Sequence, residues 1–239
     1  MTQLTETGSD CETMLIRPIA HIRTDFPEKF GVPRQSGRVS ELLGKIFFCR
    51  PFRDMAALRG LEGFSHIWLI FGFSKVNEEQ THSLTVRPPR LGGNQRVGVF
   101  ASRSPFRPNR LGLSSVRLCG IELSSNGPSL TVSGADLVDG TPIYDIKPYL
   151  PFADAHPAAA GGYAATAESH RLHVIASEKA FNIIPEEKRR ALLSCIAEDP
   201  RPSYQNDANR IYSMSFSGFT VHFTVSGNTA IVTDTVKEE

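Results

Sequence analysis

The chain has 239 residues, a formal net charge of +1 and 40% hydrophobic residues. This composition excludes a wholly disordered chain, because enough apolar side chains are present to form a core. The length permits one large domain, or a medium domain with a smaller one. The longest apolar run, over residues 64–73, contains Ser65 and His66 and is too short for a transmembrane helix.

Cysteine and histidine spacing argues against a metal site. The four cysteines have no C-x-x-C spacing, and the seven histidines show neither an H-x-x-x-H nor an H-E-x-x-H pattern. We therefore expect reduced, mostly buried thiols in a reducing compartment. The polar segment over residues 1–7 does not resemble a signal peptide. These features predict a soluble cytoplasmic protein without a metal and without membrane association.

The first two thirds of the chain predict short strands. Residues 1–13 are expected to form a disordered tail, and a strand-like pattern begins at Met14. Segments rich in Val, Ile and Phe, separated by Gly and Pro, predict strands at 45–50, 64–73, 96–101, 113–122, 129–133 and 141–147. One brief helix is predicted over residues 54–59. Many short strands favour a barrel or sandwich over alternating strands and helices.

The composition changes near the end of this region, which predicts a second domain. Residues 158–168 are rich in Ala and Gly and are expected to be a linker between domains over 14–157 and 169–239. In the second domain Pro185, Glu186 and Glu187 predict the start of a helix that ends before Pro200. Strands are predicted at 170–176, 211–216, 219–225 and 230–233, with turns at Ser217-Gly218 and Gly227-Asn228. This is a small α+β domain.

Arginine is concentrated in one part of the chain. Between Gln80 and Ile121 there are seven arginines, no lysine and no acidic residue. Arginine forms planar, paired hydrogen bonds with phosphates and stacks on bases. Phe100 and Phe106 lie in the same stretch and offer stacking faces. The stretch is typical of a surface that binds an anionic partner, although solvated strand edges with distant ion pairs would give the same pattern.

Three loop-like segments carry the remaining candidate chemistry: residues 31–37, residues 87–94 continued by 99–112, and residues 136–152. Asp139 and Asp145 in the third segment are candidates for orienting a ribose or accepting a proton, but the Asp139–Pro142 sequence is equally that of a simple turn. His66 is equally a hydrogen-bonded core residue. The sequence has neither G-x-G-x-x-G nor a Walker loop, so a nucleotide-like cofactor would bind outside a Rossmann fold.

Together these segments resemble the TrmO family of tRNA (adenine-37-N6) methyltransferases. The matching stretches are FGVPRQSG (30–37), LEGFSHIW (61–68), TVRPPRLGGN (85–94), VGVFASRSPFRPN (97–109), DLVDGTPIYDIKPYLPF (136–152) and EDPRPSY (198–204). The resemblance covers about residues 14–239. It implies a mainly β fold, in which a single-sheet β-barrel binds S-adenosylmethionine and a small α+β domain follows. It also implies a homodimer.

The resemblance implies a cofactor pocket and a tRNA substrate. The residues matching the pocket are Pro33, Arg34, Gln35, Ser65, His66, Ile67, Arg103, Leu113, Asp136, Leu137, Val138, Asp139, Gly140 and Thr141. Asp139 or Asp145 is the hypothetical general base. The candidate RNA-binding residues are Arg87, Arg90, Arg107, Asn109, Arg110, Lys147, Arg201 and Tyr204. The implied substrate is a tRNA, expected to be threonine tRNA, whose adenosine 37 carries a threonylcarbamoyl group (t6A37), and the product is its N6-methylated form.

One residue departs from the family pattern. Many relatives have proline after the Arg-Pro-Asn motif, where this chain has Arg110, so we expect the geometry of this turn to differ. Two alternatives to the enzyme remain at this point, a non-catalytic tRNA-binding module and a small-molecule methyltransferase on the same barrel. A metal-dependent hydrolase is less consistent with the sequence, because the His and Cys spacings do not support one.

Overall fold

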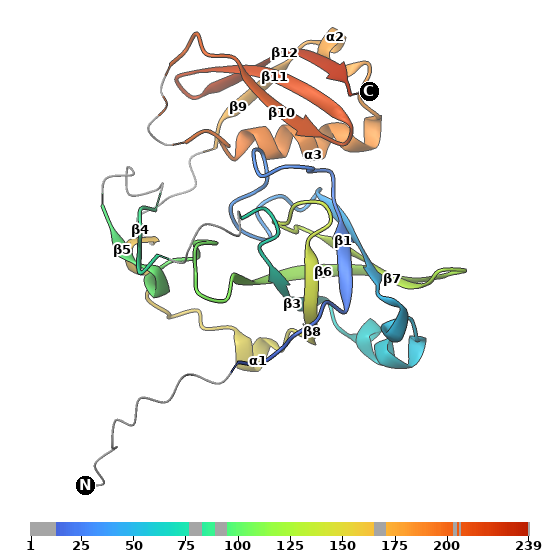
Figure 1. Cartoon of the computed structure of the whole chain (residues 1–239). Coiled ribbons are helices and arrows are strands. Elements are labelled where there is room, and N and C mark those ends of the chain that lie inside the picture. Colours follow the sequence, from blue (N-terminus) through green and yellow to red (C-terminus); the bar gives the residue numbers. More distant parts are fainter. Residues whose placement is uncertain are drawn as a thin grey trace, which may run out of the picture.

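The computed structural model describes residues 13–76, 83–88, 95–164, 171–202, 205 and 207–238. Almost the whole predicted N-terminal tail and part of the predicted linker lie outside these residues. The described chain forms a β-barrel and a smaller α+β domain stacked on one end of it (Figure 1). This agrees with the predicted fold class.

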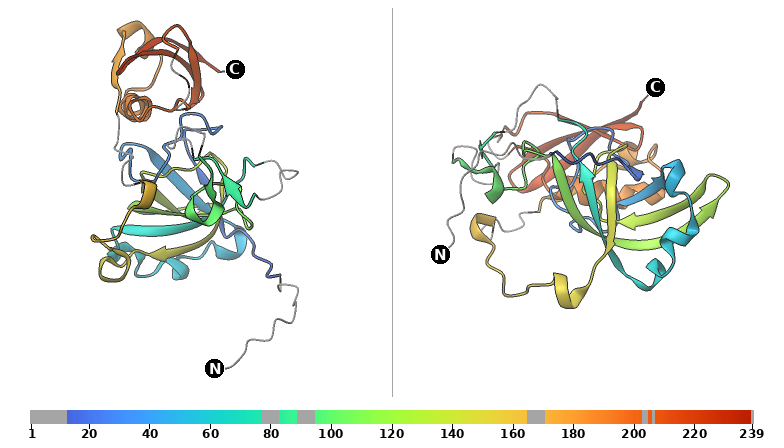
Figure 2. Two further views of the ribbon diagram at one scale, coloured as in Figure 1. Left: turned by 90° about the vertical axis from the view of Figure 1, so that its left-hand side faces the viewer. Right: turned by 60° about the horizontal axis from the view of Figure 1, so that its bottom comes forward.

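Six antiparallel strands close into the barrel in the order β1-β2-β7-β6-β3-β8. Their bounds are Ala20–Arg23 (β1), Leu43–Phe48 (β2), His66–Gly72 (β3), Leu111–Ser124 (β6), Gly127–Ser133 (β7) and Pro142–Pro148 (β8). Alternate residues such as Ile67, Leu69 and Phe71 in β3 point into the barrel and are buried. The closed sheet leaves no free edge strand within it and surrounds an apolar core (Figure 2).

Short elements decorate the barrel. Between β2 and β3 lie three 3-10 helices, η1 (Arg50–Phe52), η2 (Met55–Leu58) and η3 (Leu61–Gly63). A two-stranded sheet pairs β4 (Thr85–Val86) with β5 (Val97–Gly98), and η5 (Val99–Ala101) follows it. After β8 come α1 (Pro151–Asp154) and η6 (Gly162–Ala164).

The C-terminal domain is a four-stranded sheet covered by a helix. The sheet has the order β10-β11-β12-β9, with strands Tyr212–Phe216 (β10), Phe219–Ser226 (β11), Thr229–Lys237 (β12) and His173–Ala176 (β9). The helices are α2 (Glu178–Phe181) and α3 (Glu186–Ala197). Figure 1 shows α3 on the side of the sheet that faces the barrel. The predicted helix after Pro185 and both predicted hairpin turns are confirmed.

Several local predictions need correction. The predicted strand over residues 96–101 is only two residues long, because the chain enters a 3-10 turn at Val99. The predicted helix over residues 54–59 is 3-10, with Asp54 accepting a hydrogen bond from the Ala56 N–H. Of the cysteines that the structure describes, only Cys195 is buried, whereas Cys49 is half-buried and Cys119 is exposed.

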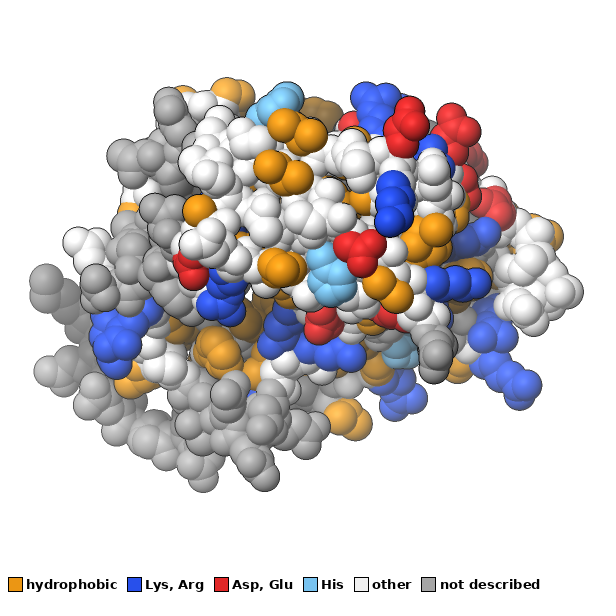
Figure 3. Space-filling model, turned by 90° about the horizontal axis from the view of Figure 1, so that it is seen from above, with side chains coloured by type: hydrophobic (Ala, Val, Ile, Leu, Met, Phe, Trp, Pro, Cys, Tyr) orange, Lys and Arg blue, Asp and Glu red, His pale blue; other side chains and the backbone are white. Residues whose placement is uncertain are grey.

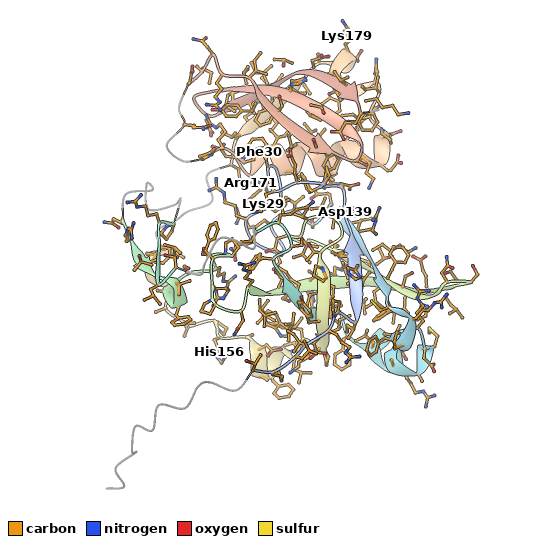
Figure 4. All side chains as sticks on the ribbon, viewed as in Figure 1. Lys29, Phe30, Asp139, His156, Arg171 and Lys179 are labelled. Atoms are coloured by element: carbon orange, nitrogen blue, oxygen red, sulfur yellow. The ribbon has the colours of Figure 1, made fainter. Side chains whose placement is uncertain are left out.

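The two domains share a core. Phe26, Val39 and Leu42 precede β2 in the sequence, yet they are buried in the same apolar cluster as the C-terminal sheet and α3. Phe30 and Val32 from the same segment pack against this cluster. Figure 4 shows Phe30 directed toward the C-terminal domain. The segment between β1 and β2 therefore belongs structurally to both domains.

Candidate active site

Three segments meet at the end of the barrel that faces the C-terminal domain. The 33–37 loop and the 134–141 loop are joined by a hydrogen bond from the Gly37 N–H to the Gly134 carbonyl of 2.8 Å. The third segment is the loop over residues 99–110, from which the Arg103 guanidinium donates to the side-chain carbonyl of Gln35. The structure thereby brings together three of the stretches that the sequence marked as candidate binding loops.

Asp136 lies at the centre of this arrangement. The hydroxyl of Ser114, which points inward from β6, donates to Asp136 Oδ1 at 2.6 Å. The backbone N–H of Ser36 and the charge of Arg103 also act on the carboxylate. Burial nevertheless outweighs these contacts and raises the pKa of Asp136 above its ordinary value. The loop therefore places a desolvated acidic group close to a guanidinium.

The next part of the loop is ordered by its own hydrogen bonds. Asp139 Oδ1 accepts the Thr24 N–H at 2.9 Å, and Arg23 Nε lies 3.3 Å from the same oxygen. The Asp139 and Gly140 N–H groups donate to the carbonyls of Phe26 and Ile22, and Thr141 Oγ1 donates to the Val138 carbonyl. Figure 4 places Asp139 near the top of β1, on the side of the C-terminal domain. Asp139 thus has a defined structural role in joining the loop to β1.

Asp145 lies elsewhere. It is exposed on β8, opposite Ile70 of β3, which in turn pairs with Leu113 of β6. Residues in register on neighbouring strands point to the same side, so Asp145 and the exposed Leu113 lie on the outer surface of the barrel. One Asp145 carboxylate oxygen accepts the Ile146 N–H.

The structure does not bring Ser65, His66 and Ile67 to the other candidate cofactor residues of the same chain. Ser65 directly precedes β3 and His66 begins it, whereas Gly72 at its other end lies on the side of the 134–141 loop. Six residues of strand separate these ends by about 20 Å. Ile67 is fully buried in the barrel core, and exposed His66 contacts Ser65 Oγ at 2.9 Å.

Two residues that the sequence reasoning missed do lie at this end of the barrel. Ser114 contacts Asp136, while its predicted neighbour Leu113 points outward. Ser74, just after β3, lies 3.5 Å from Thr141 through their hydroxyl oxygens. Strand alternation contained a signal for Ser114, because Val116 and Ser114 have the same parity and both face inward.

The candidate RNA-binding residues are dispersed. Arg87 and Asn109 are exposed, Arg107 donates to the Ser102 carbonyl at 3.1 Å, and Arg110 is half-buried. Lys147 is exposed on β8 opposite Trp68, at the His66 end of the barrel. Arg90 and Tyr204 lie outside the described residues. Seen from above, the Lys and Arg side chains visible on this face lie in several separate groups, from the left edge to the right edge of the molecule (Figure 3).

Arg201 differs from this group because its side chain is buried and paired. Only 8% of Arg201 is exposed, and its guanidinium forms two hydrogen bonds with the Asp199 carboxylate, at 2.7 and 2.9 Å. These contacts raise the pKa of Arg201. A guanidinium in this position is not presented to an RNA phosphate, which argues against the predicted RNA contact.

The Arg110 turn has an unusual backbone conformation. Arg110 has a φ of 50°, its N–H donates to the Arg107 carbonyl, and its carbonyl accepts the Phe73 N–H. Proline is restricted to a φ near −65° and has no N–H. The turn in this chain is therefore one that proline could not form.

Family models match both domains. The model described as the tRNA-methyltransferase O N-terminal domain matches residues 21–155, and the TrmO C-terminal domain model matches residues 169–238. The chain belongs to the TrmO family. Among the described residues of this TrmO-family chain, no group of three His, Cys, Asp or Glu side chains could hold a metal ion, and no helix is long and apolar enough to cross a membrane.

Named relatives and a solved structure agree with this assignment. The chain is 41% identical over 216 residues to the tRNA (adenine(37)-N6)-methyltransferase of Escherichia coli, covering 87% of this chain and 92% of that protein. It is 42% identical to a Pseudomonas aeruginosa protein, RcsF, whose name refers to an S-adenosylmethionine-dependent methyltransferase, over 88% and 92% of the two chains. The crystal structure of TrmO from Pseudomonas aeruginosa superposes with a TM-score of 0.75 at 35% identity, covering 94% of this chain and 100% of that one.

The residues of the site fit the cofactor that these names indicate. S-adenosylmethionine has a carboxylate, an ammonium, a sulfonium and ribose hydroxyls. Arg103 provides a guanidinium suited to a carboxylate, and Asp136 provides a carboxylate suited to a hydroxyl or a cation. The two come from different loops but are close enough for the charge of Arg103 to act on Asp136. The donor set is therefore complementary to the charged groups of the cofactor.

Proposed function

We propose that this protein is an S-adenosylmethionine-dependent enzyme that methylates N6 of adenosine 37 in tRNA. The observation that carries the proposal is the meeting of Gln35, Arg103 and Asp136 at one end of the barrel, in a chain whose two domains both match TrmO. The activity is that of the Escherichia coli relative, which aligns with most of this chain.

In this proposal the residues of the chain bind S-adenosylmethionine and orient the target nitrogen toward its methyl group. S-adenosylmethionine, when bound, supplies a methyl group activated by the sulfonium. Pro33, Arg34 and Gln35 with Arg103, and the loop from Asp136 to Thr141, would form the pocket. Arg103 would bind the cofactor carboxylate, and Asp136 would accept a hydrogen bond from a hydroxyl or the ammonium. The remaining task of the protein is to hold the target nitrogen in line with the methyl group, since alignment alone contributes strongly to such a transfer.

The finer substrate is part of the proposal and rests on the resemblance. We take it to be threonine tRNA that already carries t6A37, and the product to be the N6-methylated nucleoside m6t6A37. Exposed Arg87, Phe100 and Asn109 would contact the anticodon loop together with Arg107 and Arg110. The enzyme would act as a homodimer in the cytoplasm.

The decisive test is to find which nucleoside receives a labelled methyl group from S-adenosylmethionine. Purified protein is incubated with tritium-labelled S-adenosylmethionine and threonine tRNA, with or without t6A37, and the labelled nucleoside is identified after digestion. Label in m6t6A only when t6A is present supports the full proposal, while label in N6-methyladenosine would retain the reaction and reject the requirement for t6A. Binding of both tRNAs without any transfer would favour a non-catalytic tRNA-binding module.

Asp139 and Asp145 are proposed as alternative general bases, and a matched pair of variants tests the first. Asp139→Asn keeps an oxygen for the Thr24 N–H but loses the charge, while Arg23→Gln removes the same ion pair from the other side. If Asp139 accepts the proton, the single-turnover rate falls by about 10²–10⁴ in Asp139→Asn and little in Arg23→Gln. An equal loss in both would identify an ordering role.

Asp145 is tested in the same assay. Asp145→Asn removes its charge at an exposed position on β8, where the fold has little dependence on it. If Asp139→Asn and Asp145→Asn both retain the wild-type single-turnover rate, general-base catalysis by either residue is rejected. Alignment of the nucleophile would then account for the rate.

A further inference from the structure

The loop that carries Pro33, Arg34 and Gln35 is held from the side of the C-terminal domain. Arg34 Nη2 donates to the Arg201 carbonyl at 2.6 Å and to the Asp199 carbonyl at 3.3 Å. The same loop is held from the barrel side by Arg103 and by the hydrogen bond between Gly37 and Gly134. Its position therefore depends on contacts with both domains.

The turn over residues 198–201, whose carbonyls accept hydrogen bonds from Arg34, is held in place by its own contacts. Helix α3 ends at Ala197, and Asp199 adopts a left-handed conformation with a φ of 51°, a common way to end a helix. Pro200 follows, and the Arg201 guanidinium folds back onto the Asp199 carboxylate through two hydrogen bonds. Paired bonds of this kind fix direction as well as distance. The two carbonyls that accept from Arg34 are consequently fixed in space.

A second polar contact links the same two regions. The Glu198 carboxylate, only 11% exposed, accepts from Arg38 at 2.8 Å and lies 3.2 Å from Arg171. Arg38 directly follows the 33–37 loop, whereas Arg171 belongs to the C-terminal domain. Figure 4 shows Arg171 at the junction between the domains. The Glu198 carboxylate thus has two partners: Arg38, which reaches it across the junction between the domains, and Arg171, which lies in the same domain.

Apolar packing also holds the residues that precede the 33–37 loop against the C-terminal domain. The Phe30 ring stacks near Tyr212 and Phe223 of the C-terminal sheet, with centroid distances of 6.5 and 6.4 Å. A Cβ at Gly31 would overlap the side chain of Met214, so the backbone approaches the C-terminal core without room for a side chain. Gly31, two residues before the cofactor segment, is therefore held in place by the second domain.

We propose that the Glu198–Arg201 turn is a positioning element for the cofactor loop, so that the C-terminal domain controls the affinity of the barrel for S-adenosylmethionine. Asp199 and Arg201 act through Arg34, and Glu198 acts through Arg38. This inference rests on the proposed cofactor site. It differs from direct recognition of tRNA by the turn, because it requires an effect on cofactor binding when tRNA is absent.

The first experiment uses the two arginines that share Glu198. S-adenosylmethionine is titrated calorimetrically into the full-length protein without tRNA. Arg38→Gln breaks the contact across the junction, and the Kd is expected to rise about three- to fivefold. The matched control, Arg171→Gln, removes a partner of the same carboxylate within the C-terminal domain and is expected to leave the Kd unchanged. Equal Kd values for wild type and both variants would overturn the contribution of Glu198.

The second experiment tests the route through Arg34. Asp199→Asn weakens the paired contact with Arg201, and asparagine tolerates the left-handed backbone conformation. A several-fold rise in Kd is expected in the wild-type background and almost none when Arg34 is already alanine. Additive losses would instead show that Asp199 acts independently of Arg34.

A third readout does not depend on cofactor binding. Limited trypsin digestion, followed by mass spectrometry, measures the rate of cleavage after Arg34. Release of the loop in Asp199→Asn is expected to accelerate this cleavage severalfold, while Arg171→Gln leaves it at the wild-type rate. Unchanged cleavage and unchanged cofactor affinity, with weaker tRNA binding, would overturn the inference and assign the turn to RNA recognition. If the wild type itself fails to bind S-adenosylmethionine, the proposed function fails instead.

Discussion

Asp136 shows how a single residue acquires its character from tertiary contacts. Its carboxyl is surrounded by Ser114 from β6, the backbone of Ser36 and the charge of Arg103, which come from three distant parts of the sequence. Each of these contacts favours the ionised form. The loss of solvent is the largest influence, however, and it raises the pKa.

This raised pKa predicts a specific dependence of stability on pH. As the pH rises above about 4, the unfolded chain ionises Asp136 readily, while the folded protein must ionise a desolvated group. Asp136 therefore contributes stability at low pH that is lost as the pH passes through the raised pKa. Asp136→Asn avoids this loss, so its free energy of unfolding relative to wild type should increase from pH 3.5 to pH 7, as measured by urea denaturation.

Asp154 provides the control, because its pKa is lowered where that of Asp136 is raised. The Leu150 N–H and Trp68 Nε1 donate to its carboxylate at 2.8 and 2.9 Å and lower its pKa. Asp154→Asn should therefore lose stability relative to wild type as the pH rises from acid to neutral. A pH-independent difference between Asp136→Asn and wild type would contradict the assignment of a desolvated Asp136.

At the residue scale the structure brings the predicted candidate loops together, but it does not bring all of the predicted side chains to the same place. Gln35, Arg103 and Asp136 are brought together as the family motifs implied. Ser114 was missed in favour of Leu113, because Leu113 was chosen from the family resemblance and not from strand alternation, which places Ser114 on the inward face with Val116. Arg201 was predicted to bind RNA as part of the EDPRPSY stretch, whereas its side chain is buried through the paired contact with Asp199.

At the scale of elements, a close backbone contact in the candidate site lies between two glycines, Gly37 and Gly134. Gly134 has a φ of 76°, and a Cβ built there would lie 3.1 Å from the Cα and N atoms of Gly37. Since Gly134 also accepts the Gly37 N–H, this contact sets the distance between the 33–37 loop and the 134–141 loop. Backbone atoms cannot rotate away as a side chain can, so the contact is intolerant of a methyl group.

Gly134→Ala is therefore expected to lose stability for two reasons: the cost of the left-handed backbone and the clash of the new methyl group with Gly37. Gly218→Ala has only the first of these costs and serves as the control. Gly218 has a φ of 78° in the β10–β11 turn, and a Cβ there would meet nothing within 4 Å. Both variants lose about 1 kcal/mol to the left-handed backbone conformation. Gly134→Ala should lose about 1–2 kcal/mol more and should also bind S-adenosylmethionine more weakly. Chemical denaturation and calorimetry measure the two effects, and equal values for the two variants would refute the steric argument.

Element positions were predictable where local patterns are strong. The predicted ranges located five of the six barrel strands, and the strand-like pattern after Met14 marked the region of β1. The acidic start of α3 and the proline after its end located that helix. The predicted strand over residues 96–101 failed because its pairing partner is the two-residue β4 and a 3-10 turn begins at Val99. The closed order of the strands depends on long-range pairing, which the family resemblance supplied.

At the scale of the whole molecule, the domain boundary in sequence is not the boundary in structure. Composition placed the division near residues 158–168, but the segment between β1 and β2 contributes Phe26, Val39 and Leu42 to the core of the C-terminal domain. The Phe26 and Phe216 rings meet edge to face with centroids 5.2 Å apart, and both are fully buried. Lys188 of α3 also pairs with Asp25 at 2.7 Å. No local signal in the sequence reveals that an early segment packs against a late domain.

This shared core predicts that the two domains unfold together. Trp68, the only tryptophan, lies in β3, so its fluorescence reports on the barrel, while hydrogen exchange in β11 reports on the C-terminal domain. In the wild type both probes should give one coincident urea transition. Phe26→Ala should cost about 3–5 kcal/mol and shift the transitions of both probes by the same amount, although the residue precedes β2. The matched variant Phe216→Ala should have the same effect, because it removes the other ring of the same contact. A loss confined to the Trp68 transition in Phe26→Ala would show that Phe26 stabilises the barrel alone and that the two domains do not unfold together.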